Sequence, residues 1–343
     1  MNSMSLQRVA LAVTIIAVGL APAGAAGQGC EPIRFTTPVN LGGIGQAYAQ
    51  SGGQWQVGLS YRHLSSDEFF VGKDETNGPG GFGPPEFKIH TFVADIGYAI
   101  NDQFRLRLAV PFSAGQLVTH TGTGGAPVQQ DASGIGDLSL MGEGWLLTPR
   151  THQRGNIAFG LGFKAPTGSH TLKSEGAVAD QRVQPGDGGW GILLGTQAFH
   201  QITERSNAYA TGFYMISPKA ESDVTFRGAK WSVPDVYSAR LGATYDVQQD
   251  WGLSLSLGGR LDGIPIHDLV GGGDATTVKT SSQIIYADPG LSVGQGRGTF
   301  TLSVPVRMWV NREKSELEQS NPSMVNGGGF AKYLVFAGYA WRF

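Results

Sequence analysis

Apolar and polar residues alternate one by one over long stretches of this chain. In DWGLSLSLGGRLD, residues 250 to 262, the leucines fall on one face, whereas Arg260 and Asp262 fall on the other. Residues 103 to 113 and 298 to 311 repeat the pattern. A period of two residues is typical of a β-strand with one apolar and one polar face. The sequence therefore predicts an all-β fold in which each strand separates two environments.

Twelve such segments can be placed along the chain. They run approximately over residues 55–63, 88–100, 103–113, 134–147, 154–165, 189–201, 206–216, 235–247, 250–262, 284–294, 298–310 and 330–343. The links between them alternate between short turns and long stretches rich in Gly, Pro, Ser, Asp and Thr. In a soluble β-sandwich, the length of a loop does not depend on the end of the sheet at which it lies. A transmembrane barrel, in contrast, has short periplasmic turns at one end and long extracellular loops at the other.

Closure of the sheet follows from its surroundings, because lipid cannot satisfy the backbone groups of an open edge. We predict a transmembrane antiparallel up-and-down β-barrel of about 12 strands over residues 55–343. Its apolar face should contact outer-membrane lipid, with Val306, Met308 and Val310 among the lipid-facing residues of one strand. Aromatic residues near strand ends should form girdles at the two interfaces. They are Trp55, Tyr61, Phe104, Phe112, Tyr237, Tyr245, Trp251, Phe300 and Trp341.

The chain ends on FAGYAWRF, which continues this alternation to its last residue. Gly338 and Trp341 precede a terminal Phe343. This ending resembles the C-terminal signal that outer-membrane barrels present to the barrel assembly machinery. We therefore expect the last strand to form the seam with the first and to act as an assembly signal.

The N-terminus has the three parts of a secretory signal peptide, with a cation, an apolar run and a small-residue cleavage site within residues 1–26. The apolar run is shorter than the roughly 20 residues that a membrane-spanning helix needs. Residues 27–54 then form an N-terminal periplasmic segment or a small plug. This segment contains Cys30, the single cysteine of the chain, so an internal disulfide cannot form. The sequence does not decide whether Cys30 carries a lipid.

Charge and composition narrow the function classes. The formal net charge of −2 gives no basic surface for nucleic acid. The seven histidines show no spacing of a zinc site, and no G-x-S-x-G motif occurs. We expect no catalytic residues, no metal and no cofactor, and a monomer in the cell outer membrane of a Gram-negative bacterium.

The polar face of the strands carries charges into the barrel interior. By parity, the inward cations are Arg62, Arg105, Arg107, Lys164, Arg240, Arg260, Arg307, Lys332 and Arg342, and the inward anions are Asp95, Asp137, Glu143, Asp246 and Asp262. Such charges either pair across a plugged lumen or set the selectivity of an open channel. The sequence leaves these two alternatives open.

One ion pair is more specific. Asp95 and Arg107 lie on strands joined by a very short turn, so they should be opposite or diagonal on the inner face. They lie near the middle of the predicted barrel. With Glu143, Arg240 and Arg307 they are the candidates for a constriction.

Several short motifs support a family resemblance. SGIGDLSLMGEGWLL (133–147), GLGFKAPTGSH (160–170) and GDGGWGILLGTQAFHQ (186–201) contain, in order, a GxGD, a K-x-P-T-G and a G-x-G-x-W element. Together with residues 53–72, they resemble the outer-membrane family named for the meta pathway of phenol degradation. LGGIGQAYA also resembles part of the N-terminal hatch of transporters of the long-chain fatty acid class. The resemblance implies a barrel that passes small hydrophobic or aromatic molecules.

The function expected from the sequence is passive uptake of small molecules, hydrophobic or aromatic ones according to the resemblance. Two alternatives remain: a non-conducting barrel whose long loops bind a partner at the cell surface, and an outer-membrane lipid hydrolase. No group of residues in the sequence identifies the substrate.

Overall fold

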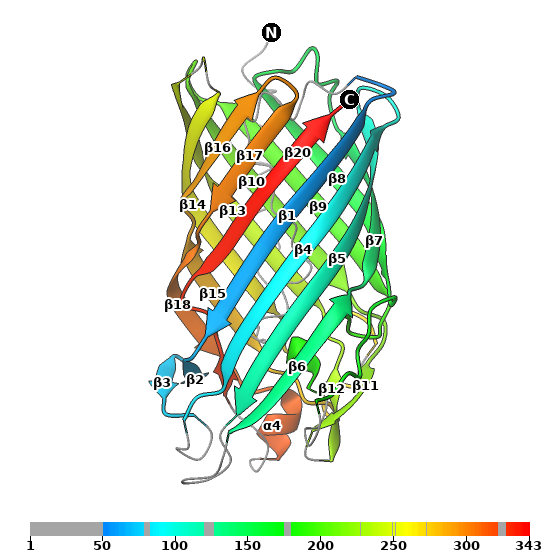
Figure 1. The fold of residues 1–343 in the computed structure, drawn as a ribbon, viewed down its shortest axis with the longest axis vertical. Coiled ribbons are helices and arrows are strands. Elements are labelled where there is room, and N and C mark those ends of the chain that lie inside the picture. The colour runs from blue at the N-terminus through cyan, green and yellow to red at the C-terminus, as the bar shows by residue number, and fades with distance from the viewer. Residues whose placement is uncertain are drawn as a thin grey trace, which may run out of the picture.

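A computed structural model describes residues 51–78, 83–119, 127–174, 180–226, 228–248, 250, 252–271, 273–321 and 327–343. Within them the chain forms a closed antiparallel β-barrel (Figure 1), as the alternation predicts. The predicted signal peptide, Cys30 and most of the predicted N-terminal segment lie outside the described residues, as does Trp251.

Twelve strands form the wall, three of them in two pieces. They are β1 (Trp55–Ser66), β4 (Glu86–Ala99), β5 (Phe104–Thr119), β6 with β7 (Val128–Ile135 and Leu138–Trp145), β8 (Gly155–Ala165), β9 (Gly191–Gln201), β10 (Ser206–Ile216), β13 (Val236–Gln248), β14 (Leu253–Ile264), β15 with β16 (Ser282–Ala287 and Gly290–Gln295), β17 with β18 (Gly298–Ser303 and Val306–Arg312) and β20 (Leu334–Arg342). The last strand, β20, pairs with β1 from Leu64↔Leu334 to Gln56↔Arg342. This closes the barrel and confirms the predicted strand number.

The remaining elements lie in the long loops. They are β2 (Phe69–Val71), β3 (Asp74–Thr76), η2 (Gln181–Val183), β11 (Glu221–Phe226), β12 (Ala229–Ser232), α4 (Glu316–Ser320) and β19 (Gly328–Gly329). We call the end of the barrel with these loops the loop end, and the opposite end, which holds Trp55, the short turns and the C-terminus, the turn end (Figure 1). Among the described residues, every helix is too short or too polar to span a bilayer.

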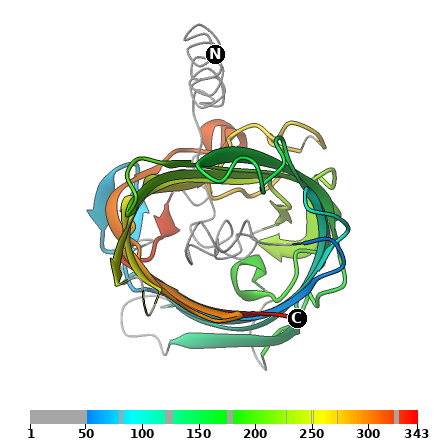
Figure 2. The ribbon, with the colours of Figure 1, turned by 90° about the horizontal axis from the view of Figure 1, so that it is seen from above.

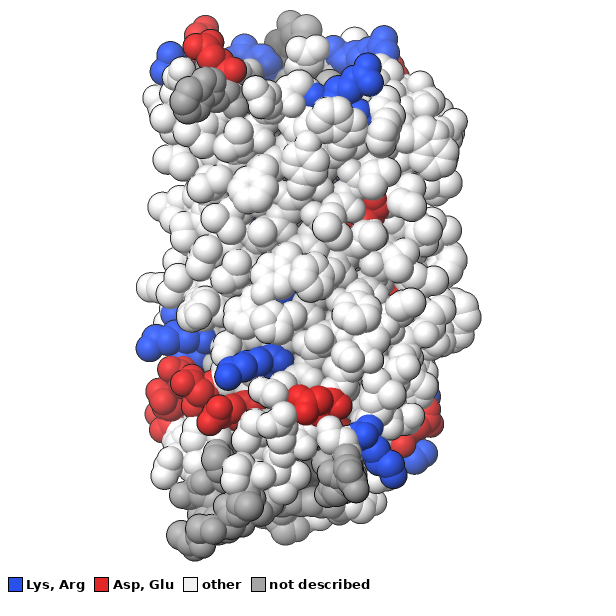
Figure 3. Space-filling model, in the orientation of Figure 1, with Lys and Arg blue, Asp and Glu red and all other residues white. Residues whose placement is uncertain are grey.

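An apolar belt surrounds the barrel. In Figure 3 the visible face is almost free of charged residues between a charged band at the turn end and another at the loop end. Leu241, Leu257 and Met308 are about two-thirds exposed within this belt. The aromatic assignment is wrong at one position: Tyr237 is buried, because Tyr214 stacks on it with ring centroids 6.3 Å apart.

The lipid-facing assignment of Val310 is also wrong. Ile285 of β15 pairs with Trp309 of β18, but the next residue, Tyr286, pairs with Arg307, so Met308 forms a β-bulge. One inserted residue exchanges the two faces of the strand beyond it. Val310 consequently points inward and is buried in the interior.

The wall has a break beside β18. β17 pairs with β20, whereas β18 pairs with β15 and meets the segment before β20 only at the isolated bridge Val306↔Tyr333. The small sheet β19-β2-β3 lies against the free edge of β18, where Gly72 bridges to Arg312. Folded loops therefore complete the wall on this side of the loop end.

The cost of a charge on the lipid-facing surface should depend on how deep in the apolar belt the charge lies. Leu241 lies in the middle of β13 on the lipid-facing side, whereas Val247 lies on the same face near the turn end. An arginine at mid-membrane costs roughly 2–4 kcal/mol, but only about 0–1 kcal/mol near an interface. We expect Leu241→Arg to lower the free energy of unfolding in phospholipid vesicles by the larger amount and Val247→Arg by the smaller. Equal costs, measured by urea titration, would contradict the membrane placement.

Candidate functional site

The barrel interior has two different halves. At the loop end it is filled by an apolar cluster formed by inward strand residues and by loop residues. Its members are Leu64, Phe70, Phe87, Ile89, Leu117, Ala132, Val183, Ile284, Tyr286, Val310, Phe330, Ala331, Leu334 and Phe336. Toward the turn end the described residues line a cavity of about 190 Å³. The lumen is therefore closed by apolar side chains at one end and is polar at the other.

Two ion pairs project into the cavity from neighbouring strands. Arg107 donates from Nε to Oδ1 of Asp95 at 2.8 Å, across the short turn between β4 and β5. Arg105 lies directly opposite Glu143 of β7 and pairs with it. All four line the cavity, so the structure brings these charges together.

Two further arginines on the cavity wall pair with carboxylates behind them. Arg240 bonds to Asp288 with 2.6 Å between Nε and Oδ2, and Arg260 bonds to Asp262 at 2.8 Å. Both carboxylates are fully buried and do not line the cavity. The wall therefore presents guanidinium groups toward the lumen while their counter-ions lie beneath.

The remaining predicted charges lie in several places. Arg342 lines the cavity and Arg62 is buried in the wall. Asp246 accepts a hydrogen bond from Ser254 at the turn end. Arg307, a constriction candidate, lies instead at the loop end, where it pairs with Glu68 and donates to the carbonyl of Phe330 at 2.8 Å.

Lys332 also approaches Glu68 at the loop end, with 3.9 Å between Nζ and Oε1, and 73% of its side chain is exposed. It precedes β20, so the strand alternation used to place it inside does not extend to it. Neither Arg307 nor Lys332 lines the cavity.

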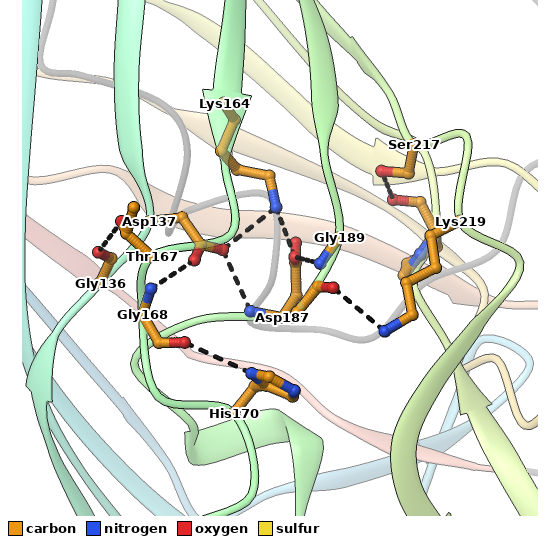
Figure 4. Close-up of polar contacts among 12 residues, drawn as sticks. Gly136, Asp137, Lys164, Thr167, Gly168, His170, Asp187, Gly189, Ser217 and Lys219 are labelled. Atoms are coloured by element: carbon orange, nitrogen blue, oxygen red, sulfur yellow. Dashed lines mark hydrogen bonds and ion pairs between the residues drawn. The ribbon is translucent and has the colours of Figure 1, made fainter.

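A buried ionic cluster joins three segments (Figure 4). Lys164 at the loop end of β8 donates to Asp137 at 3.1 Å and to Asp187. Asp137 also accepts from the backbone N–H groups of Gly168 (2.9 Å) and Asp187 (3.1 Å), and Asp187 accepts from Gly189 (2.9 Å). The Lys164 side chain is 1% exposed. One ammonium group cannot neutralise two carboxylates, so the three backbone N–H groups supply the remaining compensation, and loss of Lys164 would leave two uncompensated buried carboxylates.

Three glycines allow the backbones around this cluster to touch. A Cβ atom added to Gly168 would come within 2.9 Å of the Cα atoms of both Gly136 and Gly186. Real Cβ atoms do not approach backbone so closely, so a larger residue at any of the three would separate the segments. The hydroxyl of Thr167 fixes the same approach by donating to the Gly136 carbonyl at 3.1 Å.

The cluster holds both ends of the loop between β8 and β9 in the barrel interior, and the described parts of this loop are residues 166–174 and 180–190. Figure 2 shows η2, which belongs to this loop, within the ring of strands. Val183 of η2 joins the apolar cluster and packs against Gly115 of β5. The Arg182 guanidinium lies over the rings of Phe87 and Trp231 at 5.0 and 5.4 Å, and Arg182 also pairs with Asp180.

The three sequence motifs meet at this cluster. GxGD supplies Gly136 and Asp137, K-x-P-T-G supplies Lys164, Thr167 and Gly168, and the third motif supplies Asp187. Sequence reasoning assigned Asp137 and Lys164 to the lumen but missed Asp187, and it also missed Asp288 and Glu68. Asp187 and Glu68 lie in loops, where strand parity cannot assign them, although the repeated Gly-Asp pairs of the first and third motifs were a usable signal for Asp187. Asp288 lies within the predicted strand 284–294, which the structure interrupts at this residue, between β15 and β16.

The fold was compared with known protein families, curated protein sequences and solved structures, and the solved structures support the barrel fold. No family model matches the chain. No curated protein sequence matches it either. Among solved structures, the COG4313 outer membrane channel from Pseudomonas putida F1 matches with a TM-score of 0.64 and 15% identity, covering 89% of this chain and 100% of that one.

Two other matches are weaker. A Pseudomonas aeruginosa FadL homologue has a TM-score of 0.39 and 11% identity over 92% of this chain and 94% of that one. The P. putida toluene transporter TodX has a TM-score of 0.40 and 12% identity over 87% and 91% of the two chains. The first match shows that the chain has the fold of an outer-membrane channel, and the weaker two add nothing to that conclusion.

Removal of the Lys164 charge should release the loop. In Lys164→Met, Asp137 and Asp187 are left buried side by side, and breaking a buried ion pair costs roughly 3–5 kcal/mol. We expect trypsin to cleave after Arg182 at least about tenfold faster than in the wild type, while the barrel stays folded by heat-modifiable gel migration.

Lys230→Met is the matched control, because Lys230 forms a solvent-exposed pair with Glu221, and such pairs contribute little to stability. Its cleavage after Arg182 should equal that of the wild type. An unchanged cleavage rate in Lys164→Met would show that the cluster does not retain the loop.

Proposed function

We propose that this protein is an outer-membrane channel for small molecules with apolar or aromatic bodies, and that residues 166–174 and 180–190 form its gate. The observation that carries the proposal is Val183, which the loop inserts into the apolar cluster above the cavity. A loop that lay only on the surface would not place a short helix and a buried valine inside the barrel.

The apolar cluster favours apolar solutes over hydrated ones. A hydrated ion or sugar that replaced Val183 would lose its water contacts without gaining hydrogen bonds, which is unfavourable. An aromatic molecule would replace one apolar contact with another. The loop-end half of the lumen is thus suited to admit apolar bodies when η2 withdraws.

The two ends of the gate loop are fixed by the ionic cluster, whereas η2 can change its position. Residues 164 to 168 and 186 to 189 are held by buried hydrogen bonds of the ionic cluster. η2 is held by Val183, by Arg182 and by two buried glutamines: Gln181 donates to the carbonyl of Asp187 at 3.3 Å and Gln184 to that of Leu172 at 2.8 Å. Movement of η2 away from Gly115 would open the loop end without breaking the cluster. A solute would then reach the cavity and leave at the turn end.

The resemblance to the phenol meta-pathway family and the outer-membrane channel fold both support this function. The proposal extends to a monomer that the barrel assembly machinery inserts by way of Gly338, Trp341 and Phe343. Phe343 lies at the seam, where its N–H donates to the carbonyl of Trp55 at 2.9 Å. Cell-surface binding through the loops and lipid hydrolysis are the alternatives that an uptake measurement separates from transport.

A disulfide between η2 and the wall tests the gate. A Cβ added to Gly115 would lie 3.0 Å from the Cβ of Val183 and 2.7 Å from its carbonyl oxygen, so η2 must move slightly away from β5. The same movement brings the two Cβ atoms toward the roughly 3.5–4.5 Å that a disulfide needs. We expect Gly115→Cys with Val183→Cys, in a Cys30→Ser background, to block uptake of radiolabelled naphthalene by Gram-negative cells when oxidised. Reduction should restore the rate.

Each single-cysteine variant serves as a control and should be insensitive to oxidant. Uptake by the oxidised double variant at the wild-type rate would exclude the loop as the gate. Wild-type uptake no faster than that of cells without the protein would exclude the transport function itself.

A further inference from the structure

Three arginines of this structure share one arrangement, in which the guanidinium group pairs with a carboxylate and also lies over an aromatic ring. The distances from the guanidinium carbon to the ring centroid are 4.7 Å for Arg260 with Asp262 and Phe336, 4.6 Å for Arg307 with Glu68 and Phe70, and 5.0 Å for Arg182 with Asp180 and Phe87. A ring face attracts a guanidinium group, and the attraction is stronger away from water.

Arg240 has only one half of this arrangement. Its Nε donates to Oδ2 of Asp288 at 2.6 Å, and the other oxygen of Asp288 accepts from Ser303 at 2.6 Å. Arg240 lines the cavity, but no aromatic ring of the described chain lies over its guanidinium group. The charge of Arg240 is therefore balanced, whereas the place that a ring takes beside the other three arginines is open to the lumen.

Apolar side chains adjoin Arg240 at nearly the same depth in the barrel. Thr211 of β10 lies directly opposite Arg240, and Phe213 follows two residues nearer the loop end. Gly195 of β9 lies directly opposite Phe213, and Leu193 again lies two residues nearer the loop end. Because the strands tilt, the opposite residue on each later strand lies nearer the loop end (Figure 1), so the two shifts nearly cancel. With usual strand spacing and tilt, the depth changes by only about 2 Å per step.

Met141 of β7 continues this apolar surface. A Cβ added to Gly160 would lie 3.1 Å from the Met141 sulfur, and one added to Gly195 would lie 3.1 Å from the Met141 methyl carbon. The thioether therefore lies across the backbones of both glycines. Met141 and Phe213 both pack against the buried cluster that contains Leu193, and all three line the cavity. Thioethers and phenyl rings both make favourable contacts with an aromatic ring.

The size and charge of this region suit a neutral ring. The cavity of about 190 Å³ is large enough, since an apolar cavity of about 150 Å³ can hold benzene. An anion would compete with Asp288 for Arg240 and would meet the charge of that carboxylate, and a cation would meet the charge of Arg240. A neutral aromatic ring could lie on the guanidinium face without disturbing the ion pair.

We infer that the middle of the lumen contains a binding site for one neutral aromatic ring, which lies between the guanidinium group of Arg240 and the side chains of Phe213 and Leu193. The inference rests on the proposed function and deepens it, because it makes aromatic character, and not apolarity alone, the property that the lumen selects. A saturated ring of the same size is more apolar, but it offers no π face to the guanidinium group.

Equilibrium dialysis of the full-length protein in detergent tests this site, with protein-free detergent as the blank. The probes are radiolabelled benzyl alcohol and cyclohexylmethanol, which have the same number of non-hydrogen atoms. We expect benzyl alcohol to bind at least about fivefold more tightly, although the saturated ring is the more apolar one. Benzoate and benzylammonium, the charged analogues, should both bind more weakly than benzyl alcohol.

Arg240→Lys keeps the positive charge beside Asp288 but removes the planar face, so it should reduce the preference for benzyl alcohol to about twofold or less. Arg307→Lys is the matched control, because Phe70 already covers the Arg307 guanidinium, which does not line the cavity. This control should keep the preference of the wild type. Gly195→Ala should push Met141 into the site and weaken binding of both alcohols at least about fivefold.

Equal binding of the two alcohols to the wild type, or an unchanged preference in Arg240→Lys with a heat-modifiable barrel, would overturn the site. Benzoate binding as tightly as benzyl alcohol would overturn it as well. If Arg240→Lys does not fold, Gly195→Ala decides, and wild-type affinity of that variant would contradict the site. Binding at equilibrium requires no passage through the gate. Failure of naphthalene uptake with intact benzyl alcohol binding would therefore refute only the transport function, and the reverse result would refute only this site.

Discussion

The buried contact of one ammonium group with two carboxylates determines what this barrel encloses. Lys164, Asp137 and Asp187 come from three segments that must approach so closely that only glycines fit between their backbones. Because the cluster lies inside the wall, the loop that carries Asp187 must enter the lumen. This contact sets the position of η2. It thereby also sets the apolar packing that closes the loop end above the cavity.

The division of the interior has a simple physical basis. The inward faces of the strands carry arginines toward the turn end and apolar residues toward the loop end. Paired charges line the first half because ionic partners on neighbouring strands can meet across one or two strand spacings. The second half is packed like the core of a soluble protein, but loops supply part of the filling. A solute thus meets an apolar region and a charged region in succession.

Much of this could be predicted from the sequence. Alternation gives the twelve strands, their faces and the meeting of Asp95 with Arg107, because strand geometry is local and periodic. Alternation fails where the period changes: the bulge at Met308 exchanges the faces around Val310, and Lys332 lies before the last strand begins. Asp187 and Glu68 could not be placed because a loop has no period, and its path depends on contacts that are distant in sequence.

Hydrogen exchange of the wild-type protein in lipid tests the central claim most directly, namely that the ionic cluster keeps the segment around Asp187 folded inside the barrel. The amides of Gly186 and Asp187 donate to Ser169 and Asp137 in the interior. We predict that the amides of Gly186, Asp187 and Gly189 are protected for as long as those of the wall strands, whereas those of η2, which must move when the gate opens, exchange faster. Exchange of the Gly186, Asp187 and Gly189 amides as fast as that of the exposed loop residues 267–271 would contradict the account.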